Sequence, residues 1–162
     1  MRRWGLLALT VTVGLVSLGA IGDRCTDNLP VDQELGVQVG FMNRSDTPIQ
    51  MWLGDDSAPP AGVATSVEPG GLLFWNARMN VQLNPQGAEQ RLPTIEECLA
   101  SDSLAGSICE WADSLKGWVL VNGETKRWEF SRADLNQRVR VSTAIYVPWD
   151  GTRATVVNSL SN

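Results

Sequence analysis

The chain carries side chains suited to carboxylate chemistry but none suited to histidine chemistry. Its 162 residues include no histidine, which excludes a histidine-activated nucleophile, a histidine metal site and a histidine pH switch. Glycoside hydrolysis needs only two carboxylates that face each other across the scissile bond. The available carboxylates are Glu96, Glu97, Glu110, Asp113, Glu129 and Asp134. Their spacing selects no such pair, so the sequence predicts no catalytic residues.

Tryptophan is the most abundant aromatic residue, and it suggests a binding site. Exposed indoles stack on sugar rings, whereas buried indoles pack in a core. Trp52 is the first candidate, because alternation places Ile49 and Met51 on one face of a strand and Gln50 and Trp52 on the other. If that face is solvent, the indole supplies area and Gln50 supplies a hydrogen bond. If a loop or a second sheet covers it, Trp52 only packs.

Trp149 is the second candidate for ligand binding. It lies in the segment Pro148–Gly151, whose composition is typical of a turn, and a turn tip is usually exposed.

Three cysteines, Cys25, Cys98 and Cys109, leave one thiol over after a single disulfide. The short, serine- and glycine-containing segment between Cys98 and Cys109 closes easily, so we expect these two to bond. Bonding of Cys25 to either of them, or to Cys25 of a second chain as a dimer, is the alternative. Three cysteines without histidine fall short of a structural zinc site.

The N-terminal segment is typical of an export signal. Arg2 and Arg3 precede an uncharged, apolar stretch over residues 4–22, which ends on small residues. Cleavage after this stretch yields a secreted, periplasmic or cell-surface protein. Retention of the stretch anchors the chain, since its length just spans a bilayer. The rest of the chain offers no membrane segment.

Charge and short motifs exclude several other partners. Lys and Arg number 13 against 18 Asp and Glu, a net charge of −5 that argues against nucleic-acid binding. Asp55 and Asp56 are adjacent but fall far short of a calcium loop, so neither metal nor cofactor is expected. Asn43, Arg44 and Ser45 form an N-glycosylation sequon in a predicted turn.

Period-two alternation predicts short strands throughout the mature chain. Strands are expected at 37–42, 49–53, 63–67, 72–76, 79–83, 118–121, 125–130, 139–141, 145–147 and 154–157, some of them merging. Asn122-Gly123 predicts a hairpin, and Pro69-Gly70 predicts a type II turn. Thr94 with Glu97 predicts a helix over 95–100, and Ser131 with Asp134 predicts one further helical turn.

The pattern as a whole predicts a mostly β protein: an antiparallel β-sandwich or barrel of seven to nine short strands with one or two short helical turns. We expect a signal peptide or anchor over 1–22, an irregular arm over 23–36 and a single β-sandwich domain over 37–162.

Three functions fit these features. The first is an exported or envelope-tethered module that binds a glycan or a protein surface. The second is an assembly subunit of an extracellular array, which pairs through strand edges or Cys25. The third is a carboxylate-based hydrolase.

Overall fold

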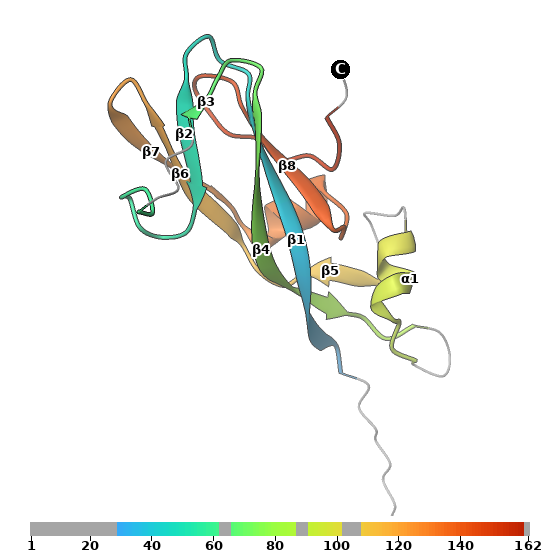
Figure 1. The fold of residues 1–162 in the computed structure, drawn as a ribbon. Helices are drawn as coiled ribbons and strands as arrows, with labels where there is room; N and C mark the ends of the chain where they lie inside the picture. The colour runs from blue at the N-terminus through green and yellow to red at the C-terminus, as the bar shows by residue number, and fades with distance from the viewer. Residues whose placement is uncertain (1–28, 62–65, 87–90, 102–107, 161–162) are drawn as a thin grey trace, which may run out of the picture.

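A computed structural model describes residues 29–61, 66–86, 91–101 and 108–160 (Figure 1). Within this part, the chain forms eight strands and two short helices, which confirms the predicted mostly β fold. The strands are β1 (Val31–Asn43), β2 (Ile49–Leu53), β3 (Ser66–Val67), β4 (Leu72–Leu83), β5 (Cys109–Trp111), β6 (Leu115–Val121), β7 (Glu124–Phe130) and β8 (Ala144–Trp149). The helices are α1 (Ile95–Ala100) and α2 (Arg132–Arg138).

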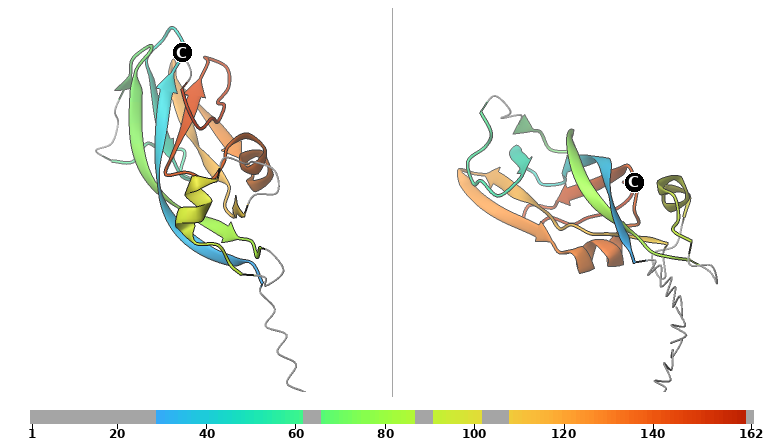
Figure 2. Two further views of the ribbon diagram at one scale, coloured as in Figure 1. Left: turned by 90° about the vertical axis from the view of Figure 1, so that its right-hand side faces the viewer. Right: turned by 90° about the horizontal axis from the view of Figure 1, so that it is seen from below.

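The strands form two four-stranded sheets. Sheet A has the order β5-β4-β1-β8, and sheet B has the order β3-β2-β6-β7. All neighbouring strands are antiparallel except β8, which runs parallel to β1. The long, curved strands β1 and β4 run side by side along sheet A (Figure 1, Figure 2).

The core lies between the inner faces of the two sheets. Alternate residues of β1 (Val37, Val39 and Phe41) are buried, and the Phe41 ring meets the Trp128 ring of sheet B edge to face at 5.8 Å. Gly117 makes this packing possible, since a Cβ there would lie 2.5 Å from the Trp128 ring. Aromatic burial of this kind supplies much of the stability of a sandwich.

Local sequence signals place the turns and helix starts as predicted. Asn122 (φ 52°) and Gly123 (φ 80°) form the tight turn of the β6–β7 hairpin. Gly70 has φ 76°, and the Gly71 N–H donates to the Glu68 carbonyl at 2.7 Å, as a type II turn requires. Both predicted capping boxes are present, at Thr94 and at Ser131.

Strand β1 begins earlier than the sequence predicts. Residues 31–36, expected to belong to an irregular arm, pair with residues 78–83 of β4. The alternation is weak there because this end of β1 projects beyond the core, and residues 31–34 are all exposed. Long-range pairing, rather than local pattern, makes the segment a strand.

Several other strand boundaries also differ from the prediction. β4 is unbroken, and β5 lies in a segment that the sequence left unassigned. Residues 139–141 lie outside the strands, and residues 154–157 make only isolated bridges at Ala154 and Val157. Valine alternation alone does not create a strand, because a strand also needs continuous pairing with a neighbour.

Asn43 joins the two sheets at one end of the sandwich. Its side chain is fully buried, and its Nδ2 donates to the carbonyls of Thr47 (2.8 Å) and Val67 (2.7 Å). Its Oδ1 accepts hydrogen bonds from the Ser45 N–H (2.9 Å) and the Ser45 hydroxyl (2.6 Å). Because Asn43 ends β1 and Val67 ends β3, one amide connects both sheets and the intervening turn. The sequon asparagine is therefore inaccessible to a glycan in the folded chain.

We predict that Asn43→Ala lowers the free energy of unfolding by about 2 to 4 kcal/mol, because it leaves buried carbonyls without donors. Asn43→Asp, which keeps the shape and loses the donors, should be similarly destabilised. Urea denaturation followed by tryptophan fluorescence measures both. Asn76→Ala removes an exposed amide of β4 and is the control. Equal unfolding midpoints for the Asn43 and Asn76 variants would contradict the prediction.

Candidate binding face

Trp52 is buried, so the expectation that it is an exposed stacking residue is wrong. Its side chain is only 2% exposed, and its Nε1 donates to the Asp56 carbonyl at 2.9 Å. The alternation was interpreted correctly, since Ile49 and Met51 face the core, but the loop after β2 covers the other face. Lys116 holds that loop through an ion pair with Asp55 at 2.7 Å. Gln50, the proposed polar partner, is half-buried in β2.

Trp149 is also buried, and its predicted exposure at a turn tip is wrong. Its side chain is 2% exposed and belongs to the main core cluster. The strand β8 continues through Pro148 and Trp149, and the turn begins only at Asp150. The inner face of β8 therefore directs the indole into the sandwich.

The exposed aromatic side chain of the described residues lies instead on the outer face of sheet A. Phe74 is 48% exposed, and its ring meets the half-buried Tyr146 ring at 6.2 Å. The two rings flank Gly40, where an added Cβ would lie 2.6 Å from Tyr146 and 3.1 Å from Phe74. Leu72, 42% exposed, extends this apolar patch along β4.

A hollow of about 460 Å³ lies further along β1 and β4, and neither Phe74 nor Tyr146 lines it. Its polar walls come from Gln38 of β1, Asn76 and Arg78 of β4, and Thr143 before β8. Gly36 opens the hollow, because an added Cβ there would meet no atom within 4 Å. Glu34 holds the Arg78 guanidinium at 2.8 Å, so the charge of Arg78 is already balanced.

The sequence contained only part of the signal for this face. Leu72, Leu73, Phe74 and Trp75 are consecutive apolar residues, so alternation alone does not show which pair faces solvent. The pairing of β1 with β4 settles the direction, because Val39, which faces the core, lies opposite Trp75, and Gly40 lies opposite Phe74. Without that register, the residues of β4 that face solvent could not be assigned.

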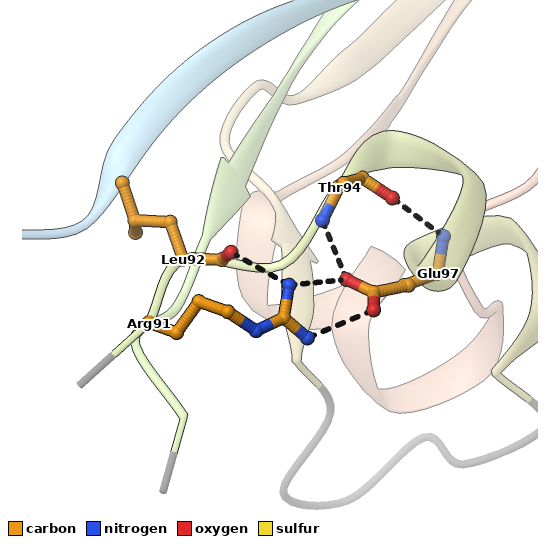
Figure 3. A network of polar contacts seen from close by, with 4 residues as sticks. All are labelled: Arg91, Leu92, Thr94 and Glu97. Carbon is orange, nitrogen blue, oxygen red and sulfur yellow. Dashed lines mark hydrogen bonds and ion pairs between the residues drawn. The ribbon is translucent and has the colours of Figure 1, made fainter. Parts of the chain in front are cut away.

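Most of the candidate carboxylates take part in local hydrogen bonds or ion pairs. Glu97 accepts two hydrogen bonds from Arg91, at 2.8 and 3.2 Å, and one from the Thr94 N–H (Figure 3). The hydrogen bonds from Arg91 hold the pKa of Glu97 below its usual value. Hydrogen bonds from Ser131 likewise lower the pKa of Asp134. A general acid needs the opposite shift.

Three of the other candidate carboxylates, Glu110, Glu129 and Asp113, have comparable partners. Glu110 pairs with Arg132 at 3.3 Å, and Glu129 pairs with Arg127 at 2.8 Å. Asp113 accepts a hydrogen bond from the Asn80 N–H at 2.6 Å. Across the described residues, no group of three or more potential ligands is arranged to hold a metal ion.

Cys98 of α1 and Cys109 of β5 are both buried, and their thiol groups share a hydrogen bond. Their side chains thus lie together, although the disulfide between them stays a prediction. Burial raises the pKa of both thiols, which disfavours the thiolate. Cys25 lies outside the described residues.

Comparison with known proteins adds no relative: no family model, no curated protein and no solved structure matches this chain. No helix in the described ranges is long and apolar enough to cross a membrane. The predicted export segment, residues 4–22, falls outside those ranges.

We predict that Trp52→Ala lowers the free energy of unfolding by about 3 to 5 kcal/mol, as truncation of a buried tryptophan typically does. Phe74→Ala, which truncates an exposed ring, is the matched control and should cost less than about 1 kcal/mol. Chemical denaturation of both variants provides the comparison. If Trp52→Ala is no more destabilising than Phe74→Ala, the indole is not buried.

We predict a disulfide between Cys98 and Cys109 in the chain recovered from an oxidising compartment, detected by non-reducing peptide mapping. In the reduced, folded chain, both thiols should react with iodoacetamide at pH 8 far more slowly than in the denatured chain, because burial disfavours their thiolates. Fast labelling of both thiols in the folded, secreted chain would contradict both expectations.

Proposed function

We propose that the chain is an exported binding module whose outer face of sheet A takes a neutral saccharide. The observation that carries the proposal is the hollow of about 460 Å³ whose wall includes Gln38 and, two residues along β4 from the exposed Phe74, Asn76. That volume is in the range of small-ligand sites, which combine aromatic area with a few polar groups. The export of the chain is part of the proposal and rests on residues 1–22 of the sequence.

The polar groups of the hollow suit hydroxyl groups. Gln38 and Asn76 each offer an amide that donates and accepts, and both side chains are exposed on the outer face. A sugar hydroxyl also donates and accepts, so paired amides match it well. Phe74 supplies an exposed ring for the apolar C–H face of a sugar.

The charge balance favours a neutral ligand over an acidic one. Arg78 is the only cationic side chain in the wall of the hollow, and its guanidinium forms an ion pair with Glu34 at 2.8 Å. An anionic ligand would have to displace Glu34 or lie beside its carboxylate. A neutral hydroxyl can instead accept from the guanidinium or donate to the carboxylate without breaking the pair.

We predict that Gly36→Val weakens binding of a neutral oligosaccharide while leaving the fold intact. The backbone of Gly36 is strand, and an added Cβ meets no atom within 4 Å, so the valine side chain enters the hollow and narrows it. Screening on a glycan array, followed by calorimetry with the best neutral hit, measures affinity. We expect at least about a tenfold loss, or ~1.4 kcal/mol, for Gly36→Val and for Phe74→Ala.

Thr125→Val, on the outer face of sheet B, is the control and should bind like the original chain. Equal binding by Gly36→Val and Thr125→Val would place the ligand elsewhere. Binding restricted to sialylated or sulfated glycans would contradict the neutral ligand.

A further inference from the structure

The strand β1 has an open edge along its N-terminal half. On one side, residues 31–42 of β1 pair with β4, but on the other side β8 pairs only with residues 38–43. The dark-blue end of β1 accordingly extends past the end of β8 (Figure 1, Figure 2). Residues 31–37 therefore have a strand neighbour on one side only, within the part of the chain described.

The backbone groups at this edge have identifiable directions. The Gln38 N–H donates to the Thr143 carbonyl at 2.8 Å, on the β8 side of β1. Because the direction alternates along a strand, Asp32, Glu34 and Gly36 direct their N–H and C=O groups to the same side. All three residues are exposed, and no backbone partner on that side is found among the described residues.

Three other strand edges of the described structure, at β5, β8 and β7, are closed or guarded. At β5, the Asn136 side chain accepts from the Trp111 N–H (2.7 Å) and donates to its carbonyl (3.0 Å), as a neighbouring strand would. At β8, Tyr146 exchanges two backbone hydrogen bonds with Val157, at 2.8 and 3.0 Å. At β7, Lys126 lies in register with the buried Val119, a charged residue on the core-facing side. Such devices prevent pairing with other chains.

The side chains that flank the open edge determine which kind of strand could pair with it. Val31, Gln33 and Leu35 alternate with Asp32 and Glu34, so one face of the edge carries two apolar residues and an amide, and the other face is acidic. Arg78 balances Glu34, whereas Asp32 has no ion-pair partner among the described residues. A complementary strand would carry apolar residues on one face and a basic residue opposite Asp32 on the other.

A second copy of this chain fits the edge poorly. Antiparallel pairing of two β1 edges that opposes Asp32 to Gly36 places Glu34 directly opposite Glu34 of the other copy. Like charges in that position destabilise a sheet. We propose that the open edge of β1, residues 32–36, is a strand-addition site for an extended, basic segment of a partner protein. This proposal does not rest on saccharide binding, since the edge lies in the plane of sheet A and the hollow on its outer face.

The probe is a short acetylated and amidated peptide in which lysine and threonine alternate with valine, titrated into the full chain by calorimetry. Two variants separate strand pairing from simple charge attraction. Glu34→Ala removes the carboxylate and keeps the N–H, whereas Glu34→Pro removes both. Proline suits an edge strand when its missing N–H faces solvent, so the ladder to β4 should persist. Circular dichroism and thermal unfolding check that both variants fold.

We expect the lysine peptide to bind the original chain and to protect the amides of Asp32, Glu34 and Gly36 from hydrogen exchange. Glu34→Pro should bind it at least about tenfold more weakly than Glu34→Ala, because only the proline variant loses a main-chain hydrogen bond. Asp32→Lys should shift the preference to a matched peptide with glutamate in place of lysine.

Four results would overturn the proposal. They are no binding of the lysine peptide, equal affinities for the Glu34→Pro and Glu34→Ala variants, equal binding of the glutamate peptide by the original chain, and dimerisation of the free chain that Glu34→Pro abolishes. The last result, measured by sedimentation, would assign the edge to a second copy. Phe74→Ala, which truncates a ring of the proposed saccharide site on β4 and leaves the β1 edge unchanged, should leave peptide binding intact. A failure of saccharide binding and a failure of strand addition are therefore distinguishable.

Discussion

The buried amide of Asn43 is the constraint on which the arrangement of both sheets depends. A side-chain amide removed from water must satisfy its donors and acceptor within the protein, and here four hydrogen bonds do so. The main chain at the same residue adds two more, from Asn43 N–H to the Gly71 carbonyl and from Gly70 N–H to the Asn43 carbonyl. The end of β1, the turn before β2 and the turn before β4 are thereby held together, and Arg44 adds a contact to Trp149 of β8.

With that end fixed, the pairing of β1 with β4 determines which side chains face outward. One register places Val39 opposite Trp75 on the inner face and Gly40 opposite Phe74 on the outer face. The same register sets Gln38 beside Asn76 and Gly36 beside Arg78. Gly36 on β1 thus lies opposite the long side chain of Arg78 on β4, and the missing side chain at Gly36 leaves space within the hollow. The candidate site is a property of two strands in register rather than of any local motif.

Turns and helix caps, which depend on neighbouring residues, could be predicted from the sequence. Burial of a side chain by a distant segment could not. Helix caps at Thr94 and Ser131 and the turn at Asn122 depend on neighbouring residues only, so they were predicted correctly. The side of β2 on which Trp52 lies was also predicted. Its burial was not, because it depends on a loop that returns over sheet B and is held by Lys116, more than sixty residues along the chain. The exposure of Phe74 was missed for the same reason, since it depends on pairing with β1.

The parallel pairing of β8 with β1 has a consequence for the order of folding. β1 is an inner strand of sheet A, yet its partner β8 begins only at Ala144, near the other end of the chain. Contacts between such distant segments carry a large loop-closure entropy and slow the folding of β proteins. Sheet A therefore stays incomplete until nearly the whole chain has been synthesised. Until β8 pairs, β1 exposes its β8-side edge along its full length, and the pairing of β8 completes sheet A.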